Sequence, residues 1–342
     1  MNASDKTDKN KLIILTGPTA VGKTDLSIKL AKAIDGEIIS ADSAQVYKGL
    51  DIGSAKVTED EMQGVKHHLI DVYEPDFSFD VTVFQSDAKR IVNEIYSRGH
   101  IPIVVGGTGF YIQALLYDIA FDGDNKEDSS DRSYRDMLEK YVEETGNIDK
   151  LYDELTNVDP VSAKMIHKNN VRKVIRALEF YHIHKTPISE HNQAERSKES
   201  AYDSYYFVLT MNRDKLYQRI NKRVDIMRDG GLLDEVINLK KRGVNSSMTS
   251  MQAIGYKEIL EALNIIEEQN IETDSEEYAR IINVAFEKIK LNTRHFAKRQ
   301  LTWFRRERDV IWLDKDTYSD NYQLDSEKTD ERILEYIKEK IC

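Results

Sequence analysis

The chain has 342 residues, which is enough for two domains or for one core that carries an insertion. Its 40% hydrophobic and 32% charged residues exclude a disordered chain, and no segment approaches the roughly 18 apolar residues of a membrane span. The first ten residues lack the apolar stretch of a secretory signal, and the single cysteine, Cys342, excludes an internal disulfide and a multi-cysteine zinc site. We therefore expect a cytoplasmic protein with no membrane partner.

The net charge of −11 is distributed unevenly along the chain. Residues 122–157 and the tail after Trp312 are acidic, whereas residues 288–308 hold eight Lys or Arg and one Glu, with three aromatic residues among them. A basic segment of this kind fits either a solvated helix face or a surface that binds nucleic acid. The negative total therefore does not exclude a nucleic-acid partner.

Short apolar strands alternate with helical patterns in the first third of the chain. The sequence predicts strands at 11–16, 37–40 and 101–105 and helices at 24–34 and about 83–96. Strands that alternate with helices predict a parallel α/β sheet.

The pattern becomes helical after Tyr117, beginning with a Gly/Asp/Ser-rich linker at 121–131. A strand-like run returns at 204–210, as if the chain re-entered the sheet after an insertion. Long amphipathic helices are expected from Arg213 to about Arg308.

Residues 17–24, GPTAVGKT, match the phosphate-loop pattern G-x-x-x-x-G-K-[ST] and lie between a predicted strand and a predicted helix. Gly17 and Gly22 allow the backbone to curl so that successive N–H groups point at phosphate oxygens, and Lys23 adds a point charge. The Thr24 hydroxyl would be a ligand to Mg²⁺. The expected phosphate-binding residues are Gly17, Pro18, Thr19, Ala20, Val21, Gly22, Lys23 and Thr24.

These patterns predict a P-loop NTPase-like parallel sheet core with an all-helical insertion domain and C-terminal helices. The expected division is a disordered tail at 1–10, a core at 11–119 and 201–312, a helical insertion domain at 120–200, and an acidic segment at 313–342.

The phosphate loop predicts phosphate binding but does not identify the reaction. A guanine-reading N-K-x-D occurs at 125–128, but it lies in a polar linker and does not follow a strand. A kinase usually carries an acid at the end of a central strand, whereas 101–105 runs into Gly106–Gly109 without one. Asp42 does follow a strand, and it could be a metal ligand, a general base or a turn cap.

Six blocks of the sequence form a recognisable series. They are GPTAVGKT, SADSAQVYKGLDIGSAK (40–56), HHLIDVYEP (67–75), VVGGTGFY (104–111), AIGYKE (253–258) and TRHFAKRQLTWFR (293–305). Together they resemble the tRNA dimethylallyltransferase (tRNA isopentenyltransferase) family, and they occur in the family's order between about residues 12 and 308. The resemblance is to the bacterial type, because the zinc-finger extension of some eukaryotic relatives is not seen.

The resemblance implies transfer of a dimethylallyl group from dimethylallyl diphosphate to the exocyclic amine of the adenosine that follows the anticodon, in tRNAs that read U-starting codons. It implies Mg²⁺ as cofactor, tRNA and dimethylallyl diphosphate as partners, and Asp42, Thr108 and Lys23 as catalytic residues. We expect a monomer. A nucleotide or small-molecule kinase and a non-catalytic RNA-binding ATPase remain the alternatives.

The resemblance also assigns binding residues, and it implies that the helical insertion domain at 120–200 contacts tRNA. Arg219 and Arg223, spaced i,i+4, are candidates for holding the diphosphate. The adjacent His67 and His68 lack a spaced third ligand, so a structural role is expected. The residues expected to contact tRNA are Asp42, Ser43, Ala44, Gln45, Thr108, Arg172, Lys173, Arg176, Gln252, Gly255, Tyr256, Lys257, Lys298, Arg299, Gln300, Trp303 and Arg305.

Overall fold

The computed structural model describes residues 9–121, 129–319 and 326–341 and divides the chain into two compact units. The first unit contains Met1–Leu116 and Tyr202–Cys342, and the second contains Tyr117–Ala201. Most of the expected tail at 1–10, most of the linker at 121–131 and the N-K-x-D run at 125–128 lie outside the described residues.

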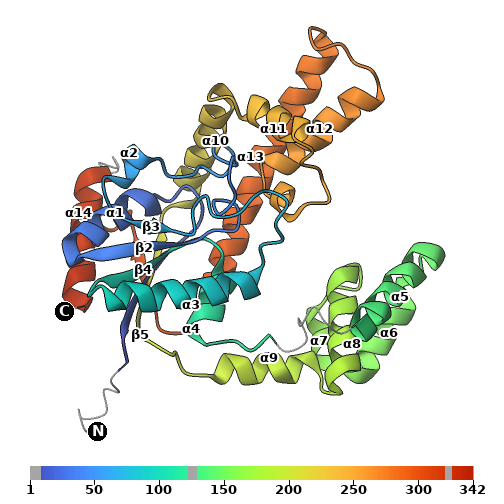
Figure 1. Cartoon of the computed structure of the whole chain (residues 1–342), viewed down its shortest axis with the longest axis horizontal. Helices are drawn as coiled ribbons and strands as arrows, with labels where there is room; N and C mark the ends of the chain where they lie inside the picture. Colours follow the sequence, from blue (N-terminus) through green and yellow to red (C-terminus); the bar gives the residue numbers. More distant parts are fainter. Residues whose placement is uncertain (1–8, 122–128, 320–325, 342) are drawn as a thin grey trace. The chain divides into compact units, whose positions relative to one another are not determined.

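A parallel sheet forms the centre of the first unit (Figure 1). Within the described part of the chain it has six strands in the order β3-β2-β4-β1-β5-β6. β1 lies between β4 and β5 and is buried on both faces, as expected for a parallel sheet covered by helices. The strands are β1 (Lys11–Thr16), β2 (Gly36–Ala41), β3 (His67–His68), β4 (Ile101–Gly106), β5 (Asp203–Thr210) and β6 (Val310–Asp314).

Helices cover both faces of this sheet. The crossovers β1–α1–β2 and β2–α3–β4 run in opposite directions along the sheet, so their right-handed geometry places α1 and α3 on opposite faces. The helices involved are α1 (Lys23–Ile34), the short α2 (Glu59–Met62), α3 (Val81–Ser97), α4 (Gly109–Leu116) and α14 (Ser326–Ile341).

The expected acidic segment at 313–342 contains α14, which belongs to the first unit. β6 completes the sheet, and Figure 1 shows α14 beside α1. Ile333, Ile337 and Ile341 of α14 are buried in the same core as Leu26 and Leu30 of α1. The i, i+4, i+8 spacing of these isoleucines forms one apolar helix face, which the high charge of the surrounding residues obscured.

A second group of helices in the first unit follows β5. α13 packs against both α10 and α12, and Ser275 caps its start by accepting a hydrogen bond from the N–H of Tyr278 at 3.1 Å. The far end of α13 contacts α4, next to the end of β4. The helices are α10 (Arg213–Asp229), α11 (Leu232–Lys241), the 3₁₀ turn η1 (Thr249–Gln252), α12 (Tyr256–Glu268) and α13 (Glu276–Phe304).

The second unit is helical and has its own core, which includes Leu138, Leu151, Leu155, Val174 and Leu178. In neither unit is a described helix both long enough and apolar enough to span a bilayer. The helices of the second unit are α5 (Ser129–Thr145), α6 (Ile148–Val158), α7 (Pro160–Met165), α8 (Val171–His184) and α9 (Ile188–Ser197).

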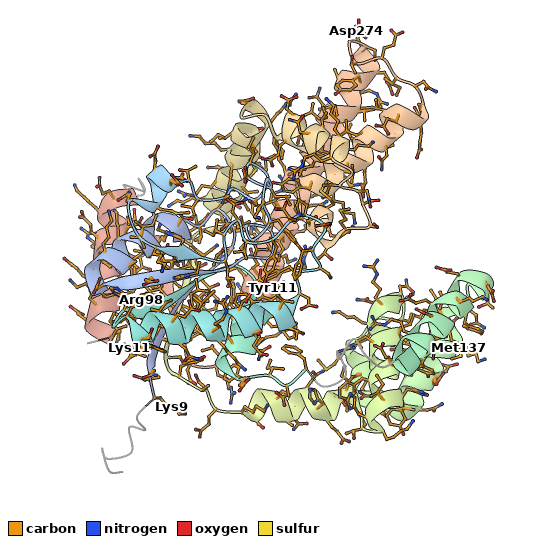
Figure 2. The ribbon with its side chains drawn as sticks, in the orientation of Figure 1. Lys9, Lys11, Arg98, Tyr111, Met137 and Asp274 are labelled. Carbon is orange, nitrogen blue, oxygen red and sulfur yellow. The ribbon has the colours of Figure 1, made fainter. Side chains whose placement is uncertain are left out.

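A buried carboxylate ties the edge of the sheet to α3. Both oxygens of Glu37 on β2 accept hydrogen bonds from the guanidinium of Arg98, at 2.9 and 2.8 Å, and His68 Nε2 lies 2.6 Å from Glu37 Oε2. Figure 2 labels Arg98, which follows the last residue of α3. Burial raises the pKa of Glu37, but these contacts outweigh it and lower the pKa to about 2. The expected structural role of His68 is consistent with this pairing.

We expect Glu37→Gln to lower the free energy of unfolding by about 1–3 kcal/mol at pH 7, because Arg98 and His68 lose their charged acceptor. The native pKa of Glu37 is lower than its unfolded value of 4.5. The difference between wild type and variant should therefore be complete above about pH 4.5 and should shrink as the pH falls toward 2.

Urea denaturation at pH 7, 4.5 and 3 measures this difference. Glu268→Gln, at an exposed position on α12, is the matched control and should change stability little at any of these values. A Glu37→Gln penalty that stays constant down to pH 3 would contradict the prediction.

Candidate active site

The phosphate loop and Asp42 open onto the same cavity of the first unit, which has a volume of about 290 Å³. Its walls come from the loops that follow β1, β2 and β4, from the segment at 252–254, and from α10 and α13. The lining residues are Thr19, Ala20, Asp42, Ser43, Ala44, Gly53, Ser54, Gly107, Thr108, Ile220, Arg223, Val224, Met227, Gln252, Ala253, Ile254, Ile289, Thr293, Phe296, Arg299 and Gln300.

The phosphate loop has a tightly curled backbone. Gly17 has a φ of 146°, and a Cβ at this position would lie 2.5 Å from the carbonyl oxygen of Leu209. Gly22 has a φ of 93°, which favours glycine, and helix α1 begins immediately after it. The loop thus places the positive end of a helix beside the cavity, which favours an anion there.

Lys23 bends back over this loop. Its Nζ donates hydrogen bonds to the carbonyl oxygens of Gly17 and Pro18, at 3.0 and 2.9 Å. Burial, and then the nearby charge of Arg223, lower the pKa of Lys23 to about 8, and the charge of Asp42 only partly opposes them. An anion beside the loop would restore the charged form of Lys23.

The two candidate arginines of α10 have different positions. Arg223 lines the cavity, and burial lowers its pKa. Arg219 is exposed outside the lining, where its Nε donates to the carbonyl oxygen of Ala20 at 2.8 Å. The geometry therefore favours Arg223 as the residue that would meet an anion and Arg219 as one that holds the loop.

Lys315 is a further cation beside the loop, and the sequence reasoning missed it. Its Nζ lies 3.4 Å from the carbonyl oxygen of Val21 and 2.7 Å from Asp330 Oδ1, and both charged side chains are almost fully buried. Lys315 follows β6 in a segment that we expected to be separate from the core. No motif contains it, so only the fold identifies it.

Asp42 and Thr108 are brought together by backbone hydrogen bonds. Asp42 follows β2, and its Oδ1 accepts from the N–H of Ala44 at 2.9 Å and of Gln45 at 3.4 Å, which fixes the carboxylate at the turn. The N–H of Thr108 donates to the carbonyl oxygen of Ala41 at 3.2 Å. Half-buried Asp42 thus presents a carboxylate to the cavity beside the Thr108 side chain.

The oxygen donors near the loop fit a divalent cation that is held mainly by phosphate oxygens. Thr24 is exposed at the start of α1, outside the cavity lining, and Asp42 is the nearby carboxylate in it. No group of three or more His, Cys, Asp or Glu that could hold a metal occurs among residues 9–121, 129–319 and 326–341. Hard oxygen ligands in small number match the behaviour of Mg²⁺, which retains waters and binds through phosphates.

The residues expected to contact tRNA divide by location. Seven line the cavity, namely Asp42, Ser43, Ala44, Thr108, Gln252, Arg299 and Gln300. The Lys257, Lys298 and Arg305 side chains are exposed, and Trp303 is half-buried against Gly109 and Phe110. In the second unit, Arg172 and Lys173 are exposed on α8, whereas Arg176 lies 3.2 Å from Glu179, which also pairs with Arg135 at 2.6 Å.

Two of the residues expected to contact tRNA, Gln45 and Tyr256, instead make hydrogen bonds within the protein. Gln45 donates through Nε2 to the carbonyl oxygen of Ala55 at 3.2 Å. Tyr256, which follows the buried Gly255, is fully buried, and its hydroxyl donates to Glu235 Oε1 at 2.6 Å. Burial, and then the charge of Glu235, raise the pKa of Tyr256, so the hydroxyl stays protonated.

Glu235 shapes one wall of the cavity, and sequence reasoning did not find it. Its carboxylate accepts hydrogen bonds from the consecutive N–H groups of Asp51, Ile52 and Gly53, at 3.1, 2.8 and 3.2 Å. Gly53 is itself part of the cavity lining. Glu235 belongs to no motif and no spaced pair, so no sequence pattern selects it.

The chain is similar to a known protein family and to several named proteins. The sequence pattern of the family described as IPP transferase matches residues 45–307, which is more than half of the chain. The chain belongs to the IPP transferase family. The match begins after the phosphate loop and Asp42.

Two relatives are named tRNA dimethylallyltransferase. The one from Lachnoclostridium phytofermentans is 52% identical over 308 residues, which cover 90% of this chain and 93% of the relative. The one from Bacillus thuringiensis is 45% identical over 341 residues, which cover 100% and 98%. The crystal structure of the tRNA isopentenylpyrophosphate transferase from Bacillus halodurans is 41% identical, with a TM-score of 0.66 and 97% of each chain covered. The resemblance and the P-loop NTPase-like fold expected from the sequence are confirmed, and the chain is an enzyme.

We expect the affinity for inorganic pyrophosphate to fall as the pH rises above about 8, because Lys23 loses its proton there. Titration calorimetry at pH 7 and 9, in two buffers of different ionisation enthalpy, measures the affinity and the protons taken up on binding.

Lys23→Met is the comparison that separates Lys23 from the ionisation of pyrophosphate itself. The variant should bind roughly 10–100-fold more weakly at pH 7, because it lacks one charge-assisted contact. It should also take up fewer protons near pH 8. Equal proton uptake in both proteins would show that Lys23 does not titrate at the site.

Proposed function

We propose that this enzyme transfers a dimethylallyl group from dimethylallyl diphosphate to the exocyclic amine of the adenosine that follows the anticodon in tRNAs that read U-starting codons. The products would be isopentenyladenosine and diphosphate. The observation that carries the proposal is the single cavity shared by the phosphate loop and Asp42. The names of the relatives point to the same donor and acceptor.

The phosphate loop would hold the leaving diphosphate. Lys23, Arg223 and the loop N–H groups provide positive charge where negative charge develops as the allylic C–O bond breaks. Mg²⁺, held by phosphate oxygens with help from Thr24, would supply further neutralising charge.

The apolar part of the cavity suits the five-carbon group. Val224 and Met227 on α10 and Ile289 and Phe296 on α13 line it beside the loop. A transition state with allylic cation character reacts readily with water, so apolar walls protect it from that side reaction.

Asp42 would act as the general base. The lone pair of the adenine amine is delocalised into the ring, so the amine is a weak nucleophile and benefits from proton removal during attack. A positioned base contributes about 10²–10⁴-fold to such a step. The adenosine would have to leave its stack to reach Asp42, which costs a few kcal/mol at most in a loop.

The exposed basic residues of α13 would bind the tRNA backbone. Lys298 and Arg299 lie at the end of this helix next to the cavity, and Arg305 follows it. We place the enzyme in the cytoplasm, where its tRNA substrate is found. We also expect it to act as a monomer. The exposed Arg172 and Lys173 of the second unit are further candidates for phosphate contact.

We expect Asp42→Asn to lower the turnover of dimethylallyl transfer about 10²–10⁴-fold while tRNA binding changes little, because only the proton acceptor is lost. Label from dimethylallyl diphosphate is followed into adenosine of unmodified tRNA in the presence of Mg²⁺. Asp229→Asn, at an exposed position at the end of α10, is the control.

The same assay tests the function itself. A kinase would instead transfer a phosphoryl group from ATP, and an RNA-binding ATPase would hydrolyse ATP and leave the tRNA unmodified. Wild-type protein that incorporates no label into adenosine would refute the proposal.

We expect the double variant Lys298→Ala/Arg299→Ala to bind tRNA more weakly and with a smaller salt dependence. Each lost phosphate contact should reduce the slope of log K against log salt by roughly 0.7–0.9. Fluorescence anisotropy at several salt concentrations measures this slope. Lys241→Ala/Lys338→Ala removes the same charge from exposed positions on α11 and α14 and should leave the slope unchanged. Equal slopes in wild type and the α13 variant would argue against this surface.

A further inference from the structure

One buried side chain of α13 bridges two of the loops that line the cavity. Gln300 is 5% exposed, and its Oε1 accepts a hydrogen bond from the N–H of Thr19 at 2.9 Å. Its Nε2 donates to the carbonyl oxygen of Gly107 at 3.0 Å. Thr19 belongs to the phosphate loop after β1, and Gly107 belongs to the turn after β4.

The environment requires an amide in one orientation. The acceptor side faces an N–H group and the donor side faces a carbonyl group, so an inverted amide would lose both hydrogen bonds. The amide also packs directly on the glycine, because a Cβ built at Gly107 would lie 2.1 Å from Gln300 Nε2. A carboxylate could satisfy Thr19 but would meet the Gly107 carbonyl with an acceptor.

The bridge continues to the carboxylate on the other side of the cavity. Thr108 follows Gly107, and its N–H donates to the carbonyl oxygen of Ala41 at 3.2 Å. Asp42 is the next residue after Ala41. The contacts therefore form one path from the phosphate loop through Gln300 to Asp42.

We propose that Gln300 is a positioning residue that holds the phosphate loop and the 107–108 turn in register, and so fixes the distance between the departing diphosphate and Asp42. This role replaces the tRNA contact that the family resemblance implied for Gln300, because both ends of its amide are already engaged within the protein. The inference rests on the proposed function, since it assigns the loop to the leaving group and Asp42 to the base. Misplacement of reacting groups by about 1 Å can cost on the order of 100-fold in rate.

Gln300→Met tests this role with a side chain of similar length that neither donates nor accepts. We expect kcat for dimethylallyl transfer to fall about 10–100-fold, while the KM for tRNA stays within about threefold of wild type. Hydrogen exchange should be faster in peptides that contain the Thr19 amide, and pyrophosphate should bind several-fold more weakly. Thr302→Ala, at an exposed position on the same helix, is the control and should match wild type.

Gln300→Glu separates the two hydrogen bonds. It keeps the acceptor for the Thr19 N–H, so exchange at that amide should stay near the wild-type rate, but kcat should still fall because the contact with Gly107 is lost. If Gln300→Met does not fold, this variant decides the question by the same two measurements.

Three results would overturn the inference. They are an unchanged kcat in the folded variants, a rise in the KM for tRNA with kcat unchanged, and wild-type exchange at Thr19 in Gln300→Met. The exchange and pyrophosphate measurements need no transfer activity. A wild-type enzyme that fails to prenylate tRNA would therefore refute the proposed function, while these measurements would still report on the bridge.

Discussion

Parallel pairing of the strands is the constraint on which the site depends. β1 pairs with β4 and β4 pairs with β2, all in one direction, so the loops that follow them emerge at the same edge of the sheet. That edge receives the phosphate loop, Asp42 and the Gly107–Thr108 turn. The backbone topology thereby brings three segments that are distant in the sequence to the same cavity.

Side chains from the later helices then complete this edge. Arg223 from α10 brings positive charge, and Gln300 from α13 joins two of the loops. Glu235 on α11 gathers three backbone N–H groups of the 51–53 segment, and Lys315 reaches the phosphate loop from beyond β6. The strands determine where the loops meet, and these polar contacts determine how rigidly the loops stay there.

The sequence predicts those elements and site residues that show hydrophobic periodicity or belong to a motif. The strands at 11–16 and 101–105 and the helix at 24–34 were found because apolar runs and helical spacing report burial directly. Gln300 was found only as part of a block, and its partners Thr19 and Gly107 are about 280 and 190 residues away, which no local pattern can show. α14 escapes prediction because its apolar residues are few among many charges, and β6 because VIWLD is an apolar run of only five residues beyond the long helices.

The burial of α14 in the core of the first unit affects how the chain can fold during its synthesis on the ribosome. β1 is made early but gains its neighbour β5 only after residues 117–201 have been synthesised, and Ile333, Ile337 and Ile341 come later still. The second unit is one continuous segment with its own core, so it can fold before β5 is available to pair with β1. During synthesis the apolar strands are therefore exposed longest in the unit that carries the active site.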